Sequence, residues 1–198
     1  MTTRNLDFVF RPQSVAVAGA SERAGSVGAV VLRNILAGGF TGPVYPINPK
    51  YGRVQDRECY RRVADLPGDP DLAIIVTPPT SVPRLIAELG ERGCKAAVVL
   101  TAGIGAKGGL RQEMLDAARP HLLRIVGPNT IGILSPHQSL NASFAHLTPA
   151  PGRLALVSQS GAIVSSVIDW AVAEGVGFSQ VVSLGDMADV DVGDCLNW

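Results

Sequence analysis

Residues 14–28 read SVAVAGASERAGSVG, and this stretch decides the fold. The apolar run at 14–18 is short, continuous and rich in valine, which predicts a strand buried on both faces. Glycines and small polar residues fill 19–28, and apolar residues then recur at helical spacing until Gly38. A buried strand, a glycine loop and a helix in that order are typical of the first unit of a parallel, doubly wound α/β sheet.

The same alternation of short apolar runs and amphipathic stretches continues along the chain. Further strands are expected at 44–47, 71–77, 96–100 and 124–126, and further helices at 83–92 and 110–122. Because the strand runs are continuous rather than alternating, both faces of the sheet should be covered by helices. These elements complete a Rossmann-like domain over residues 1–130.

The remainder, residues 131–198, predicts the start of a second α/β domain. Residues 131–151 are rich in Ser, Pro, Asn and His, and we expect an irregular connection there. A strand at 154–157, an apolar helix at 162–174, a strand at 178–184 and a helix from 192 then form one βαβ unit. Since such sheets usually have ~4–6 strands, we expect this domain to be incomplete and the chain to be a fragment.

Composition excludes several classes of protein. The 198 residues include 17 Lys+Arg and 17 Asp+Glu, and this zero net charge argues against a protein that wraps nucleic acid. With 46% apolar and 17% charged residues the chain is not disordered. No apolar run approaches the ~18 residues of a membrane span. Three scattered cysteines predict neither a disulfide framework nor a zinc site, and indicate a reducing compartment, the cytoplasm.

The glycine loop predicts an anion site. Glycines let a ligand approach the backbone, and free N–H groups at a helix start favour a phosphate or pyrophosphate. A tight structural turn is the alternative. The spacing Gly19-x5-Gly25-x2-Gly28 is not the dinucleotide fingerprint G-x-G-x-x-G, and the P-loop pattern is absent.

The end of the second strand narrows the ligand class. Residues 46–50 read PINPK and carry no acid for ribose hydroxyls. Asn48 and Lys50 suit a ligand with an extra phosphate near its ribose, which fits coenzyme A and also NADP. For Lys50 the alternative is a solvated surface lysine without a ligand. For the function of the domain, NAD(P) binding in an oxidoreductase is the less favoured alternative.

A second anion site is expected at 157–163, which reads VSQSGAI. Ser160 as N-cap would leave the N–H groups of Gly161 and Ala162 open to a phosphate. The alternative is a plain serine cap worth ~1 kcal/mol. Asn129, after the fifth strand, could orient an acyl or phosphate group, or form an Asx turn. Two sites made of backbone N–H groups would let a neutral chain bind a phosphate-rich cofactor without a basic surface.

The order of the motifs resembles a known family. The strings SVAVAGASERAGSVG, LAGGFTGPVYPINPK, DLAIIVTPP, KAAVVLTAGIG, RIVGPNTIGIL, LNASFA, GRLALVSQSGAI and GFSQVVSLGDMADVD follow one another as in NDP-forming acyl-CoA synthetases, the succinyl-CoA synthetase α-subunit superfamily. The second domain of that family is flavodoxin-like. LNASFA and SLGDMADVDVGD are most similar to the ligase-like half of acetate–CoA ligases and of GNAT-fused protein lysine acetyltransferases.

The resemblance implies coenzyme A as cofactor and a set of binding residues. The CoA contacts would be Gly19, Ala20, Ser21, Gly25, Ser26, Val27, Asn48, Pro49, Lys50, Thr77, Pro78, Pro79, Thr101, Ala102, Gly103 and Asn129, and the phosphate site Ser160, Gly161 and Ala162. The CoA set lies at the carboxyl ends of strands, where open parallel sheets bind ligands. For Pro78-Pro79 a strand-ending turn is the alternative.

The resemblance also implies the reaction of the full enzyme. An acid, CoA and ATP give acyl-CoA, ADP and phosphate through acyl phosphate and a phosphohistidine. The family's histidine would lie beyond Trp198, so we expect CoA binding without turnover and no catalytic residue here. His121, His137 and His146 should be structural. Partners would be an ATP-grasp half or a GNAT domain elsewhere in the full protein, and a homo-oligomer stays open.

Two alternatives remain at this stage. A CoA- or acyl-CoA-sensing domain that regulates a GNAT acetyltransferase is the second hypothesis for function. The acidic run Asp186, Asp189, Asp191 and Asp194 could hold magnesium, but we expect a solvated loop with acids near a helix start, and no metal.

Overall fold

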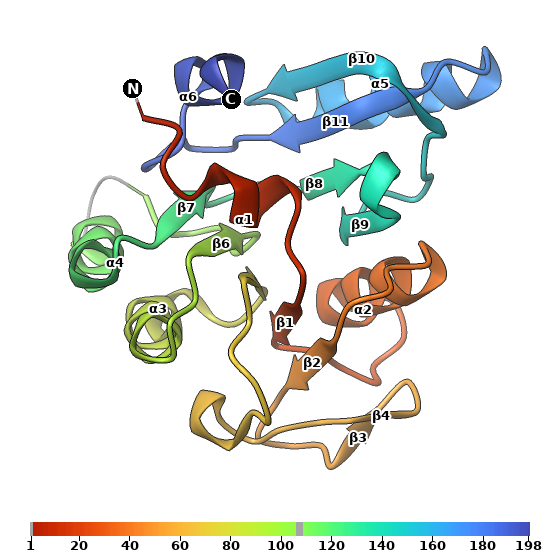
Figure 1. Ribbon diagram of the computed structural model, residues 1–198. Coiled ribbons are helices and arrows are strands. Elements are labelled where there is room, and N and C mark those ends of the chain that lie inside the picture. Colours follow the sequence, from red (N-terminus) through yellow and green to blue (C-terminus); the bar gives the residue numbers. More distant parts are fainter. Residues whose placement is uncertain (1, 106–108) are drawn as a thin grey trace.

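The computed structural model describes residues 2–105 and 109–198 (Figure 1). Its larger sheet has five parallel strands in the order β2-β1-β5-β6-β7. The strands are β1 (Val15–Ala18), β2 (Val44–Ile47), β5 (Leu72–Ile75), β6 (Ala96–Val99) and β7 (Arg124–Val126), and the helices between them are α2 (Val27–Ala37), α3 (Val82–Glu91) and α4 (Leu110–Ala118). The predicted parallel α/β sheet is confirmed.

Helices cover both faces of this sheet. Along β1, Val15 and Val17 point into one apolar cluster, the first core, which also holds side chains of α2 and of the N-terminal helix α1 (Leu6–Phe10). Ala16 and Ala18 point into a second core with side chains of α3 and α4. Because successive strand residues face opposite sides, continuous burial along each strand is what two covered faces require.

The second sheet has the strand order β10-β11-β8-β9. Its elements are β8 (Gly132–Ser135), β9 (Leu140–Ser143), β10 (Pro151–Ser158), α5 (Gly161–Ala173), β11 (Phe178–Ser183) and α6 (Val192–Asn197). The predicted βαβ unit is confirmed, since β10 and β11 pair in parallel across α5. Short elements complete the fold: β3 (Arg53–Val54), β4 (Arg57–Glu58), and the 3-10 helices η1 (Val63–Asp65), η2 (Pro79–Ser81), η3 (Arg119–His121) and η4 (Pro136–Gln138).

The irregular connection expected at 131–151 is wrong, because β8 and β9 form a buried antiparallel hairpin there. The strand was not predicted because β9 contains the polar residues Asn141 and Ser143, which break the apolar pattern expected of a buried strand. Asn141 and Ser143 are buried because they bond each other, with Ser143 Oγ donating to Asn141 Oδ1 at 2.6 Å. Asn141 Nδ2 also donates to Thr148 Oγ1 at 2.7 Å. Buried polar side chains of this kind are tolerated when their hydrogen bonds are made.

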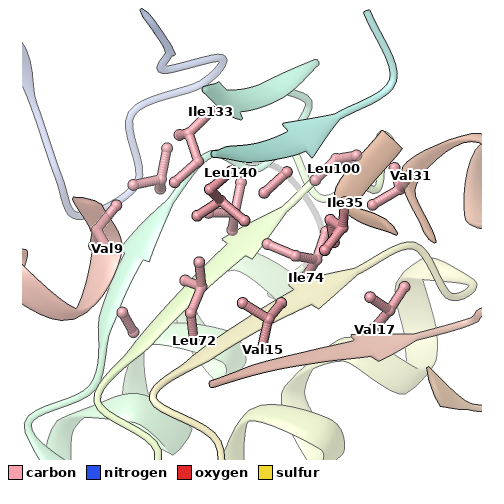
Figure 2. Close-up of a cluster of buried hydrophobic side chains, with 14 of the residues drawn as sticks. Val9, Val15, Val17, Val31, Ile35, Leu72, Ile74, Leu100, Ile133 and Leu140 are labelled. Atoms are coloured by element: carbon pink, nitrogen blue, oxygen red, sulfur yellow. The ribbon is translucent and has the colours of Figure 1, made fainter. Parts of the chain in front are cut away.

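The two sheets share the first core. Figure 2 shows Ile133 of β8 and Leu140 of β9 in the same cluster as Val15, Leu72 and Ile74 of the large sheet. Val182 and Leu184, at the end of β11, belong to it as well. A single apolar cluster therefore runs from the parallel sheet into the second sheet.

Helix α2 is fixed to β9 by hydrogen bonds as well as by apolar contacts. Asn34 Nδ2 donates to the carbonyl oxygens of Ser143 and Ala145, each at 2.9 Å. At the end of α2, a Cβ on Gly38 would lie 2.9 Å from the Ser139 carbonyl oxygen, so the approach needs glycine there. The helix that follows the glycine loop is thus joined to the second sheet.

The acidic run is not the solvated loop that the sequence predicted. Arg124 of β7 is 2% exposed, and it pairs with Asp194 (Nη2–Oδ2, 2.7 Å) and with Asp189 (Nε–Oδ2, 2.9 Å). Asp191 caps α6 by accepting from the Asp194 N–H at 2.8 Å. A guanidinium buried at a strand needs carboxylate partners, and these acids supply them.

Candidate functional site

Two pockets lie at the carboxyl ends of the parallel strands. The first, the loop pocket, measures about 760 Å³ and lies against the glycine loop, the end of β2 and the start of α3. The second, the junction pocket, measures about 880 Å³ and lies between the ends of β6 and β7 and the start of α5. Both are lined by Val27 and by residues 76–78, so they meet at the end of β5.

The loop pocket contains the open N-terminus of α2. Ser26 caps this helix, its Oγ accepting from the Ala29 N–H at 3.4 Å. Within the described part of the chain, the N–H groups of Val27 and Gly28 have no acceptor. Two free donors at the positive end of a helix are the kind of group that can accept an anion.

Glycine is required at two positions for the loop to close on the helix. A Cβ on Gly28 would lie 2.0 Å from the Gly19 carbonyl oxygen, and Gly19 itself has φ +97°. Gly25 has φ +74° with open space around its Cα, so it serves the turn and not a close approach. Gly19 and Gly28 thus bring loop and helix together in one backbone cradle.

Asn48 holds the end of β2 against this cradle. Its Nδ2 donates to the Ala20 carbonyl oxygen at 2.7 Å, and its Oδ1 accepts from the Lys50 N–H at 2.9 Å. Both polar atoms of the amide are used within the protein, so Asn48 positions the pocket wall. Lys50 is exposed at the wall.

The junction pocket contains the second open helix N-terminus. Ser160 caps α5, its Oγ accepting from the Ile163 N–H at 3.3 Å. Among the described residues nothing accepts from the N–H groups of Gly161 and Ala162. Across the pocket, Asn129 has φ +59° and its Nδ2 donates to Asp186 Oδ1 at 3.2 Å. Asn129 therefore presents an exposed amide whose orientation is fixed by a carboxylate.

The structure gathers most of the predicted residues in these pockets. The loop pocket is lined by Gly19, Ser21, Ser26, Val27, Asn48, Pro49, Lys50, Thr77 and Pro78, and the junction pocket by Val27, Thr77, Pro78, Thr101, Ala102, Asn129, Ser160, Gly161 and Ala162. Ala20, Gly25, Pro79 and Gly103 line neither. Ala20 is a fully buried residue of the glycine loop, and Gly103 lies beside Pro79.

Several lining residues were not predicted. Arg23, Arg61, Arg62 and Arg84 join Lys50 around the loop pocket, with Glu88 as the carboxylate among its lining residues. The expected lack of a basic surface is therefore wrong for this pocket. The only sequence feature that indicated these basic residues is the pair of consecutive arginines at 61–62. In the junction pocket, Phe144, Gln159 and Asp186 were also missed.

The histidines lie outside both pockets. The His121 ring packs on α3, where a Cβ on Gly90 would lie 2.4 Å from it. His137 Nε2 lies 2.9 Å from the Gly152 carbonyl oxygen, and His146 pairs with Asp169 at 2.8 Å. In residues 2–105 and 109–198, no three His, Cys, Asp or Glu side chains are grouped to hold a metal ion.

The thiols do not contribute to the pockets either. Burial raises the pKa of Cys94 to about 12 and that of Cys195 to about 11, and it also raises the pKa of Cys59. All three thiols are therefore protonated near neutral pH.

No helix of the described chain is both long and apolar enough to cross a bilayer.

Comparison with known families shows which family the chain belongs to. Residues 13–136 match the family described as the CoA binding domain, and residues 151–198 match the succinyl-CoA ligase-like flavodoxin domain. The chain belongs to the NDP-forming acyl-CoA synthetase superfamily. Coenzyme A is accordingly its ligand, and the open backbone donors and basic side chains of the loop pocket fit a phosphate-rich cofactor.

Individual relatives agree with this assignment. An ADP-forming acetate–CoA ligase of Methanocaldococcus jannaschii is 40% identical over 195 residues, which cover 98% of this chain and 27% of the relative. An ADP-forming 4-hydroxybutyrate–CoA ligase of Nitrosopumilus maritimus is 42% identical over 193 residues, 93% of this chain and 28% of the relative. This chain therefore spans little more than a quarter of these two relatives.

A solved structure extends the agreement to the fold. The acetyl-coenzyme A synthetase 1 of Ca. Korarchaeum cryptofilum, described as dinucleotide forming and solved with phosphate and ADP, matches with a TM-score of 0.92 and 38% identity. The match covers 97% of this chain and 42% of that chain. The predicted family and fold class are confirmed.

Proposed function

We propose that this chain is the CoA-binding part of an ADP-forming acyl-CoA synthetase and that CoA lies across both pockets. One observation carries the proposal: two serine-capped helices, α2 and α5, begin at pockets that meet at residues 76–78. A ligand with phosphates near one end and a reactive group at the other fits this arrangement.

The order of the strands supports one direction of binding. The large sheet runs β2-β1-β5-β6-β7, and parallel strands present their carboxyl ends at one edge. The CoA diphosphate would lie on the open N–H groups of α2, after β1. The pantetheine chain would then cross Val76 and Pro78, after β5, and the thiol would lie in the junction pocket, after β6 and β7. The thiol is the group that receives the acyl chain.

In this binding mode each set of residues has a separate task. Gly161 and Ala162 would hold a phosphate at the start of α5 through their backbone N–H groups. Asn129 would hold the acyl or phosphate oxygen near the thiol by hydrogen bonding, with its amide oriented by Asp186. Phe144, 37% exposed at the pocket wall, would shield the thiol from water.

The whole protein would convert an acid, CoA and ATP to acyl-CoA, ADP and phosphate, with the nucleotide held by an ATP-grasp part elsewhere. The acyl group is left open, because the relatives above are named for acetate and for 4-hydroxybutyrate. Both are ligases, so a regulatory role beside a GNAT acetyltransferase has no support from them. The cytoplasm is the compartment that supplies ATP and CoA and keeps the three cysteines reduced.

Isothermal titration tests the proposal directly. We expect CoA to bind at one site and NADP+ to give no heat. Ser26→Ala should weaken CoA binding because the cap that sets the first turn of α2 is lost, whereas the same change at exposed Ser166 should leave it unaltered. Binding of NADP+ without binding of CoA would overturn the proposal.

A further inference from the structure

Basic side chains gather around the loop pocket, although the net charge of the whole chain is zero. The basic rim of the pocket consists of Arg23, Lys50, Arg61, Arg62 and Arg84. These residues come from the glycine loop, the end of β2, the segment before η1 and helix α3. The whole chain carries equal numbers of basic and acidic residues, and Glu88 is the acid among the lining residues of this pocket. A rim drawn from four parts of the fold is therefore a local feature of the pocket.

Two of these arginines are held by carboxylates that a phosphate could replace. Arg62 makes two hydrogen bonds to Asp65, at 2.9 and 3.3 Å, and Arg84 Nε lies 2.7 Å from Glu88 Oε1. The Arg62 side chain is 71% exposed, and exposed pairs of this type contribute little to stability. A doubly charged phosphate is a stronger acceptor for a guanidinium than a single carboxylate.

Arg61 lies at the far edge of the sheet from the junction pocket. Its neighbour Tyr60 donates its N–H to the Pro46 carbonyl oxygen, and the Tyr60 carbonyl accepts from the Asn48 N–H, both at 2.9 Å. These bonds place residues 60–62 beside the end of β2, which is the edge strand. Within the described chain Arg61 makes no ion pair within 4.0 Å. A guanidinium without an ion-pair partner and one with an exposed partner are thus adjacent at this edge.

We propose that Arg61 and Arg62 bind the phosphate on the ribose 3′ oxygen of CoA and make the site selective for CoA over dephospho-CoA. The inference rests on the proposed function, because it continues the same order of groups across the sheet. The thiol end lies over β6 and β7 and the diphosphate after β1, so the ribose phosphate falls at β2. Lys50, at the end of β2, completes the phosphate site from the other side.

The test compares CoA and dephospho-CoA on four forms of the chain by isothermal titration. These are the unaltered chain, the double variant Arg61→Ala/Arg62→Ala, the conservative double variant Arg61→Lys/Arg62→Lys, and Arg57→Ala. Arg57 is an exposed arginine of β4 outside the pocket, so its variant controls for the loss of a positive charge. Thermal melting checks that each form is folded.

The unaltered chain should bind CoA more tightly than dephospho-CoA. The double alanine variant should lose about tenfold to a hundredfold in CoA affinity, the usual effect of losing charge-assisted hydrogen bonds. Its affinity for dephospho-CoA should be unchanged, the lysine variant should keep part of the preference, and Arg57→Ala should change neither ligand. The preference for CoA should also fall as salt rises, because the rim is exposed.

Two results would overturn the assignment while CoA binding itself stands: equal affinity of the unaltered chain for both ligands, or equal loss of both in the double alanine variant. If the unaltered chain bound neither ligand, the proposed function would fail instead. The two failures are therefore distinct.

Discussion

Replacing Gly28 with alanine should damage both the glycine loop and CoA binding. In most helix interiors this change is favourable by about 1 kcal/mol, because alanine restricts the unfolded chain. Here the new Cβ would lie 2.0 Å from the Gly19 carbonyl oxygen, whereas Cβ atoms in proteins essentially never come closer than 3.0 Å to such an atom. Helix and loop must therefore separate by roughly 1 Å.

The size of the effect follows from this separation. Overpacking of a closed contact costs about 1–3 kcal/mol or more, and the backbone carbonyl of Gly19 has little freedom to yield. After the gain in helix propensity, we expect a net loss of about 2 kcal/mol. For a chain of this size each kcal/mol lowers Tm by about 2–4 °C, so Tm should fall by about 4–8 °C. A 1 Å shift also takes the N–H groups of Val27 and Gly28 out of hydrogen-bonding range, so CoA affinity should fall more than about tenfold.

Thermal melting and titration with CoA measure the two effects separately. Gly90→Ala is the matched control, because its Cβ would lie 2.4 Å from the His121 ring, away from both pockets. That variant should lower Tm and leave CoA affinity intact. If Gly28→Ala bound CoA as well as the unaltered chain and melted at the same temperature, the proposed cradle would be refuted.

Two further predictions concern stability. Asn34→Ala should lower the free energy of unfolding by about 2 kcal/mol, because the carbonyl oxygens of Ser143 and Ala145 lose their donor. Urea unfolding measures this loss. The control is Arg33→Ala, a change at an exposed neighbouring residue, which should not alter the free energy of unfolding. Asp194→Asn should cost about 3–5 kcal/mol at pH 7, because it leaves a buried guanidinium poorly paired. Although burial opposes its charged form, hydrogen bonds and the adjacent guanidinium hold the pKa of Asp194 below its usual range. The stabilisation is therefore complete above the unfolded pKa of about 4 and is lost as pH falls through the lower folded value. Urea midpoints of the two proteins should converge below that value, and a constant difference down to acid pH would contradict the reasoning.

Sequence patterns predicted the large sheet well because its strands carry an unambiguous signal. Residues 44–47 and 124–126 are strands with the predicted bounds, and the other predicted strands of this sheet differ by one or two residues at their ends. In the second sheet, β10 begins three residues earlier than predicted. Most strands of the large sheet are continuous apolar runs, as burial on both faces favours. The exception is Arg124 at the start of β7, whose buried guanidinium has carboxylate partners. The two open helix starts were also predicted, since Ser26 and Ser160 each precede an apolar helix.

The missed features depend on contacts between distant residues. The Ser143 carbonyl oxygen of β9 accepts from Asn34, which is 109 residues away, and Asp194 is 70 residues away from Arg124. Arg61 and Arg84 come together only because β2 and α3 border the same pocket. Contacts between distant residues leave no hydrophobic period or motif spacing in the sequence, so one sequence alone does not predict them.

Because one apolar cluster is common to both sheets, ligand binding at the large sheet should also stabilise the second sheet. Side chains of β1 and β5 pack with those of β8 and β11 in one cluster, so neither sheet can open without exposing the apolar surface of the other. Unfolding should therefore be cooperative across the chain. CoA at 100 times its Kd adds about 2.7 kcal/mol to the folded state. Amides of β11 should then exchange more slowly with solvent on CoA binding, although β11 lines neither pocket.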